Sequence, residues 1–146
     1  MVLHTHRLIL REYQHGDYAA LRHIHGNKEV QALRGQDVLT EQETRDEIHY
    51  VLAAQQEHPR LRYQWIIEDN GDCLSIGYCR LQRTSSQAAE IGYFLHPAAW
   101  GKGYAVETAS AMLTFAFGQL KLHRIVAGCI ASITTLSQLR CAERYW

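Results

Sequence analysis

Apolar positions fall into short runs that predict a series of β-strands. Such runs occupy residues 7–11, 63–68, 73–83 and 89–95, and they are rich in aliphatic and aromatic side chains. The segment 69–72 reads Asp-Asn-Gly-Asp and predicts a tight hairpin turn, because Asn and Gly tolerate positive φ. We therefore expect the last three of these strands to pair in antiparallel fashion.

Helical spacing of apolar residues occurs between and after these strands. Asp17 precedes a helical face at 18–24, and Thr40 with Glu43 has the spacing of a capping box that opens a helix ending near Ala54. A longer helix is predicted over 106–120 because its apolar positions follow the 3.6-residue period. The remaining predicted elements are a strand over 122–129 and a last helix that Ser132 or Thr134 would cap and that would end near Arg144.

The order of these elements indicates one α/β (α+β) domain over residues 1–146. A strand and two helices come first, three antiparallel strands follow, and a helix, a strand and a last helix complete the chain. This order predicts a mixed sheet. The sequence contains no internal repeat, low-complexity tract or linker.

Composition narrows the class of protein. The chain has 146 residues, is 47% hydrophobic, and balances 15 Lys and Arg against 15 Asp and Glu. A zero net charge removes the electrostatic basis for general nucleic-acid binding. No run approaches the roughly 20 apolar residues of a membrane helix, and the N-terminus lacks the pattern of a signal peptide. We expect a cytoplasmic protein that engages neither nucleic acid nor membrane.

Cysteines and histidines do not predict a metal centre. Cys73, Cys79, Cys129 and Cys141 are irregularly spaced in apolar surroundings, which is typical of buried free thiols rather than of disulfides or a zinc site. None of the nine histidines has carboxylate or cysteine partners at ligand spacing. We therefore expect no metal.

A glycine-bearing turn between a strand and a long helix is the strongest candidate for chemistry. Residues 100–105 read Trp-Gly-Lys-Gly-Tyr-Ala. Glycine allows a ligand oxygen to approach the backbone, and the free N–H groups at the start of a helix attract phosphate. Lys102 adds a cation. Taken alone, such a segment is weak evidence, because most turns of this kind merely connect elements, and it fits neither a P-loop nor a Rossmann fingerprint.

Three ordered motifs resemble the GNAT superfamily of acetyltransferases. They are Thr5-x-Arg7-Leu8-x-Leu10-Arg11, then Ala89-Glu90-Ile91-Gly92-Tyr93, and then Trp100-Gly101-Lys102-Gly103-Tyr104-Ala105-x-Glu107. Together with Leu122-His123-Arg124-Ile125, they look most like the ribosomal-protein alanine acetyltransferase branch (RimJ/RimL-like). The resemblance implies a twisted, mostly antiparallel sheet flanked by helices, and the family's last two C-terminal strands are expected to be lacking here.

The resemblance implies that acetyl-coenzyme A is the cosubstrate. The backbone amides of Gly101, Lys102, Gly103, Tyr104 and Ala105 would hold its pyrophosphate. The main chains of Phe94 and Leu95 would pair with the pantetheine arm, and a backbone N–H near Leu95 would stabilise the carbonyl oxygen of the thioester. The strand over 122–129 would diverge from its neighbour and open the cleft.

Two residues are candidates for catalysis. A primary amine is mostly protonated at pH 7, since its pKa is about 8 to 10.4, so a general base is expected. Glu90 is the candidate base, and the alternative is a solvent-facing strand carboxylate. Ser137 aligns with the serine of the family's Asn-x-x-Ser signature and would donate to the leaving thiolate, unless it is only a helix-surface serine. Thr134 stands at the asparagine position and can still donate to the pantetheine.

The sequence leaves two functions open. The first is an N-acetyltransferase in which a protein N-terminus or small amine attacks acetyl-coenzyme A directly with general-base help. The second is a catalytically silent coenzyme A-binding or protein-interaction module, with a homodimer formed through an open sheet edge. No pattern in the sequence identifies the acceptor.

Overall fold

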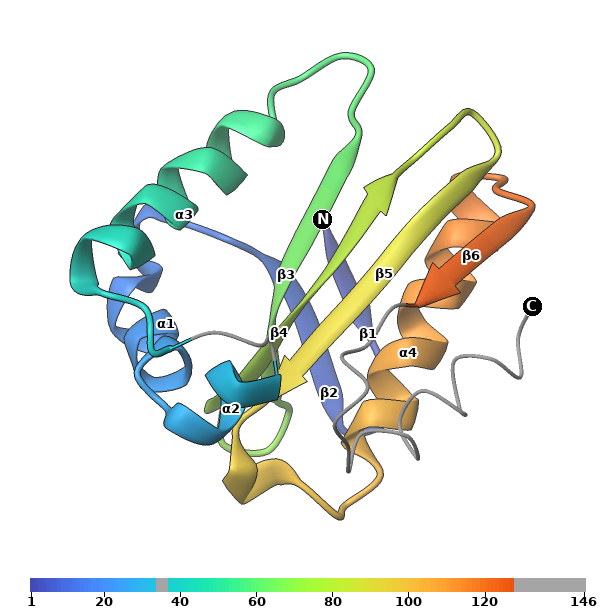
Figure 1. The fold of residues 1–146 in the computed structure, drawn as a ribbon. Helices are drawn as coiled ribbons and strands as arrows, with labels where there is room; N and C mark the ends of the chain where they lie inside the picture. The colour runs from blue at the N-terminus through green and yellow to red at the C-terminus, as the bar shows by residue number, and fades with distance from the viewer. Residues whose placement is uncertain (34–36, 128–146) are drawn as a thin grey trace.

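A single six-stranded sheet organises the protein (Figure 1). The computed structural model describes residues 1–33 and 37–127. The strands lie in the order β1-β2-β3-β4-β5-β6, and all neighbours are antiparallel except β5 and β6, which are parallel. The strands are β1 (Val2–His4), β2 (Leu8–Glu12), β3 (Arg62–Asp69), β4 (Ser75–Arg83), β5 (Ala88–Leu95) and β6 (Arg124–Ala127).

Helices cover both faces of this sheet (Figure 1). Three lie on one face, namely α1 (Tyr18–His25), α2 (Lys28–Leu33) and α3 (Glu41–Ala54). On the other face lies α4 (Tyr104–Thr114), which continues as a π-helical turn over Phe115–Gln119. Short 3-10 turns precede α1 at His15–Asp17 and follow β5 at Pro97–Ala99.

The central strand β3 explains why the sheet needs helices on both sides. Trp65 and Ile67 pack into the core that includes Met112 of α4, whereas Ile66 packs into the core with α1 and α3. All three β3 side chains are fully buried. Alternate residues of a strand point to opposite faces, so a continuous apolar run is expected where both faces are covered.

Several predicted elements are confirmed with their local causes. The capping box at the start of α3 is present: the Thr40 hydroxyl accepts from the Glu43 N–H at 3.1 Å, and the Thr40 N–H donates to the Glu43 carboxylate at 3.1 Å. The mixed, mostly antiparallel sheet flanked by helices is also confirmed. The predicted last helix lies outside the described residues.

Other expectations were wrong in detail. Strand β1 and helix α2 were not predicted, β4 begins at Ser75 rather than 73, and α4 begins at Tyr104 rather than 106. The turn between β3 and β4 lies where it was predicted, but Cys73 rather than Asn70 or Gly71 has the positive φ, at 58°. The Asp69 side chain organises this turn by accepting from the Gly71 N–H at 2.7 Å.

Of the two cysteines that the structure describes, Cys79 is a buried thiol. It is fully buried in the α4 core, and burial raises its pKa well above the ordinary thiol value. Cys73 is exposed, contrary to expectation, because it lies in the β3–β4 turn. Cys129 and Cys141 lie outside the described residues. Among the helices that the structure describes, none has the length and apolar character needed to cross a membrane.

Phe115 provides a test of the core that fixes α4 to the sheet. Its ring is 1% exposed and makes edge contacts with Tyr63 and Trp65, with centroid separations of 5.1 and 5.4 Å. Phe115→Ala is expected to lower the free energy of unfolding by about 3–5 kcal/mol, since it leaves a cavity. Urea unfolding followed by far-UV circular dichroism measures the loss. Val106→Ala on the exposed side of α4 should change stability by less than about 0.5 kcal/mol, and equal losses in both variants would contradict the packing described.

Candidate functional site

The glycine turn after β5 has the backbone that its sequence requires. Gly101 has φ 75° and Gly103 has φ 81°, and both values lie in the left-handed region that favours glycine. A Cβ built at Gly101 would have no atom within 4 Å. Glycine at 101 is therefore demanded by conformation rather than by crowding, and the backbone there is open to approach from outside.

No side chain in the part of the chain that the structure describes caps the N-terminus of helix α4. Gly103 is the N-cap residue, and its carbonyl accepts a helical hydrogen bond from the Glu107 N–H at 3.2 Å. The N–H groups of Tyr104, Ala105 and Val106 consequently have no acceptor within the helix. These N–H groups lie at the positive end of the helix dipole, next to the exposed Lys102. The arrangement suits an anion.

Trp100 ties the turn to the strand that precedes it. Its indole N–H donates to the Leu95 carbonyl at 2.8 Å, and its ring packs against the α4 core. The His96 imidazole accepts from the Ala98 N–H at 3.2 Å and closes the 3-10 turn in between. The position of the turn is thereby set relative to the end of β5.

The register of β5 decides which main-chain groups are directed toward β6. The Thr84 N–H donates to the Ala88 carbonyl at one end of the β4–β5 ladder, and the His96 N–H donates to the Ile76 carbonyl at the other. Because hydrogen-bonded pairs alternate in an antiparallel ladder, the main chain of Phe94 is directed to β4. Of the two residues expected to pair with the pantetheine arm, only Leu95 has its main chain directed to the β6 side.

Strand β6 runs parallel to the first half of β5. Ala88 through Ile91 pair with Arg124 through Ala127. The strand predicted over 122–129 was expected to diverge from β5, but over Arg124–Ala127 it pairs with β5, and residues 128 and 129 lie outside the described residues. Ser137 and Thr134, the two candidates from the last helix, also lie there.

Glu90 lies on the paired half of β5 and not at the glycine turn. It precedes Leu95 by five residues, which corresponds to about 17 Å along a strand at about 3.3 Å per residue. Its neighbours Ala89 and Ile91 point into the α4 core, so Glu90 points to the opposite face of the sheet. The side chain is 47% exposed, and its Oε1 is 3.8 Å from Nη2 of Arg80.

A network of hydrogen bonds links the segment before β2 to the glycine turn and the start of α4, and it was not predicted from the sequence. The Glu107 carboxylate accepts hydrogen bonds from the Thr5 hydroxyl, from the Arg7 N–H at 2.8 Å and from Arg7 Nε at 2.9 Å. Arg7 Nη1 donates to the Lys102 carbonyl at 2.8 Å. The guanidinium carbon lies 4.4 Å from the ring centroid of Tyr104. Thr5, Arg7 and Glu107 were noted only as parts of separate motifs, and their separation of about 100 positions hides the contact.

Ionisation in this network follows from its hydrogen bonds. Burial alone raises the pKa of Glu107, but the bonds from Thr5 and Arg7 outweigh it and leave the pKa below the ordinary glutamate value. Tyr104 also contacts Asp69. The hydrogen bond from the Gly71 N–H is the larger cause that lowers the pKa of Asp69, and the hydrogen bond from the Tyr104 hydroxyl is the next. The Tyr104 hydroxyl donates to Asp69 at 3.0 Å, which raises the pKa of Tyr104. Glu107 and Asp69 are thus held as anions at neutral pH.

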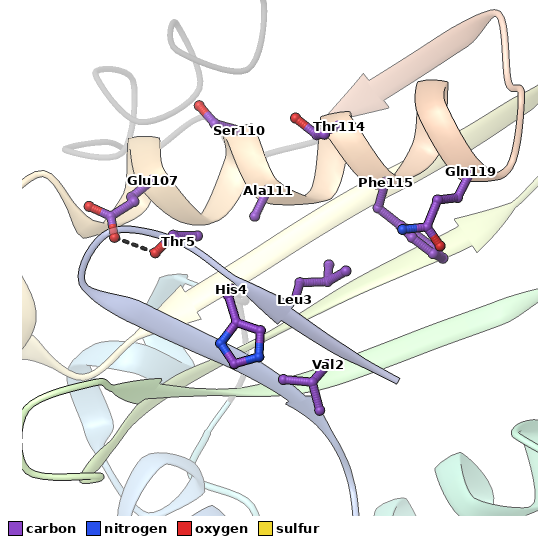
Figure 2. A pocket seen from close by; sticks show the side chains of 10 residues that line it. All are labelled: Val2, Leu3, His4, Thr5, Glu107, Ser110, Ala111, Thr114, Phe115 and Gln119. Carbon is purple, nitrogen blue, oxygen red and sulfur yellow. Dashed lines mark hydrogen bonds between the residues drawn. The ribbon is translucent and has the colours of Figure 1, made fainter.

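Two cavities flank this region. One of about 270 Å³ lies beside the turn and is lined by residues of the β3–β4 connection, α1 and the segment after β5, among them Asp69, His96, Lys102 and Tyr104. The other, of about 450 Å³, lies between β1 and α4 (Figure 2). Residues 1–33 and 37–127 contain no group of three or more His, Cys, Asp or Glu side chains that could hold a metal ion.

Comparison with known proteins assigns the fold and the motifs to one family. Residues 7–132 match the acetyltransferase (GNAT) domain. The chain is 30% identical over 130 residues to the uncharacterized N-acetyltransferase YnaD of Bacillus subtilis, covering 88% of this chain and 73% of that protein.

Solved structures agree with this match. A GNAT-family acetyltransferase from Bacillus anthracis superimposes with a TM-score of 0.84 at 26% identity, over 99% of this chain and 82% of that one. The fold is also shared with RimL, a ribosomal L7/L12 α-N-protein acetyltransferase in complex with coenzyme A, with a TM-score of 0.80, 19% identity and coverage of 99% and 82%. The chain therefore belongs to the GNAT family of acetyltransferases, whose members take the acetyl group from acetyl-coenzyme A.

Proposed function

We propose that this protein transfers the acetyl group of acetyl-coenzyme A to a primary amine by direct attack. The observation that carries the proposal is the start of α4, which no side chain of the described residues caps and where two left-handed glycines and three N–H groups without an acceptor in the helix lie beside a lysine. Such a site fits a diphosphate, because several N–H dipoles and one cation can converge on its oxygens.

The residues present fit the coenzyme in two further respects. Glu107 is the one acidic residue in the first turn of α4 and would repel a diphosphate, but Arg7 and Thr5 already occupy its carboxylate. The Leu95 main chain is directed to the β6 side, where it can donate to an extended ligand lying along β5. When bound, the coenzyme supplies an activated acetyl thioester.

The chemistry requires that a protonated amine lose its proton before it attacks. Glu90 is proposed to accept that proton, directly or through a water molecule, while the amine nitrogen bonds to the acetyl carbon and the bond from that carbon to sulfur breaks. The Leu95 N–H lies about 17 Å from Glu90 along β5, at about 3.3 Å per residue, so it is too far away to bond the carbonyl oxygen of the same acetyl group and is proposed to bond the pantetheine arm instead. Ser137 remains the proposed donor to the departing thiolate, and Thr134 a proposed contact of the pantetheine.

The acceptor is proposed as a class rather than as a compound. RimL, whose fold this chain shares, is named for acetylating the α-amine of a ribosomal protein. A protein N-terminus and a small amine are both consistent with the exposed side chain of Glu90. A screen of acceptor amines that detects release of the coenzyme thiol would identify the substrate. A silent module would release no thiol with any amine.

Coenzyme binding is the first test of the proposal. Isothermal titration of the wild-type chain with acetyl-coenzyme A should show one saturable site. Gly103→Val should weaken binding by at least about tenfold, which corresponds to about 1.4 kcal/mol. A β-branched residue is strained at φ 81°, and its Cβ would lie 3.3 Å from the Arg7 guanidinium.

The matched control for this test is Gly118→Val, since Gly118 lies just beyond α4 and a Cβ there meets no atom within 4 Å. This variant should bind like the wild type. Absence of wild-type binding at high micromolar coenzyme would contradict the proposal.

The role of Glu90 is tested separately from binding. Glu90→Gln should retain the wild-type dissociation constant for acetyl-coenzyme A and lower kcat at neutral pH by about 10²-fold or more, because a general base typically contributes about 10²–10⁴. The thiol-release assay, run from pH 6 to 9, measures both the rate and its dependence on pH. Glu57→Gln, on the exposed loop after α3, is the control and should change neither. An unchanged pH–rate profile in Glu90→Gln would show that another group is the base.

A further inference from the structure

The β1–β2 hairpin contacts the start of α4 next to the glycine turn. Figure 2 shows Thr5, at the bend of this hairpin, beside Glu107 of α4, with their hydrogen bond drawn. Arg7 follows two residues later and contacts the turn itself through the Lys102 carbonyl. Residues near the N-terminus of the chain thus contact the turn and the helix start that form the proposed coenzyme site.

One of these contacts fixes the direction of a peptide plane. The Lys102 carbonyl and the Gly103 N–H belong to the same peptide unit, and in a trans peptide the oxygen and the hydrogen point in opposite directions. Because Arg7 holds the Lys102 oxygen at 2.8 Å, the Gly103 N–H must point away from Arg7. Gly103 has φ 81° and no side chain, so nothing in the residue itself would hold that plane.

A second contact removes an opposing charge. Glu107 lies in the first turn of α4, where a carboxylate stabilises an empty helix N-terminus but repels an anionic ligand. Arg7 Nε bonds this carboxylate at 2.9 Å, and the Glu107 side chain is only 18% exposed. One guanidinium therefore binds the carboxylate and the turn carbonyl at once, which requires the planar fork of arginine.

We propose that Arg7 is a positioning residue for coenzyme binding: it orients the Gly103 N–H toward the diphosphate and neutralises Glu107 beside it. This inference rests on the proposed function, since it concerns the same turn. It assigns a role to the N-terminal Thr5-x-Arg7 motif, which neither the coenzyme contacts nor the acid–base chemistry had used.

Coenzyme A titrated calorimetrically into a set of variants tests the proposal. Arg7→Lys keeps the charge but cannot bond both partners, and we expect it to raise the dissociation constant about tenfold, in line with loss of one charge-assisted hydrogen bond. Arg7→Ala should raise it by about 10–100-fold, because Glu107 is then left uncompensated. Glu107→Gln should bind coenzyme A at least as tightly as the wild type. The double variant should bind more tightly than Arg7→Ala alone.

Arg11→Lys is the matched control for a merely structural effect. Arg11 lies on β2, four residues after Arg7 in the same motif, and its guanidinium bonds Asp17 at 2.8 Å and Glu68 at 2.7 Å, away from the turn. Thermal melts should show destabilisation in this variant, while its affinity for coenzyme A should stay within about twofold of the wild type. A structural role for Arg7 would instead make the affinity fall in step with stability in both arginine variants.

The outcomes separate this inference from the function on which it rests. Wild-type binding together with unchanged affinity in Arg7→Lys and Arg7→Ala would overturn the inference and leave the proposed function standing. A wild type that does not bind coenzyme A would overturn both. If Arg7→Ala does not fold, Arg7→Lys and Glu107→Gln still decide, because the inference requires them to shift affinity in different ways.

Discussion

Helix α4 begins at a glycine that offers no side chain to cap it, and the rest of the site depends on this open N-terminus. Unbonded N–H groups at a helix start are normally satisfied by a capping hydroxyl or carboxylate, as Thr40 does for α3. At Gly103 that partner is missing, so the helix must be secured by contacts elsewhere. Trp100 anchors the turn to β5, Phe115 packs α4 onto the sheet, and Arg7 ties it to the N-terminal hairpin.

The acidic residue in the first turn of α4 follows from the same requirement. Without ligand, Glu107 favours the helix by interacting with its positive end, and its bonds to Thr5 and Arg7 join α4 to the N-terminal hairpin. When an anionic ligand binds, the same carboxylate would repel it. Pairing it with Arg7 resolves the conflict, since the pair stabilises the fold and presents little net negative charge to the ligand.

The sequence predicted those elements whose conformation depends on residues close together in the chain. The capping box of α3, the turn between β3 and β4 and the glycine turn depend on residues close together in sequence, and all were found in place. Strand β1 has three residues and helix α2 has six, too few for a periodic signal. The Arg7–Glu107 pair spans 100 positions. The direction of the Phe94 main chain depends on the β4–β5 register, which no composition or spacing encodes.

Strand β5 connects the turn proposed to bind the coenzyme with the residue proposed as the base. Its C-terminal end leads into the turn proposed to hold the diphosphate, and Glu90 lies about 17 Å earlier along the strand by the strand rise of about 3.3 Å per residue. β4 pairs with β5 from Arg83↔Ala89 to Gly77↔Leu95, and β6 pairs with its first half, so the distance between the two positions is fixed by two ladders. A ligand that joins them must therefore be long and extended. Changes at Gly103 or Arg7 should consequently act on affinity, and a change at Glu90 on turnover, because no described side chain belongs to both positions.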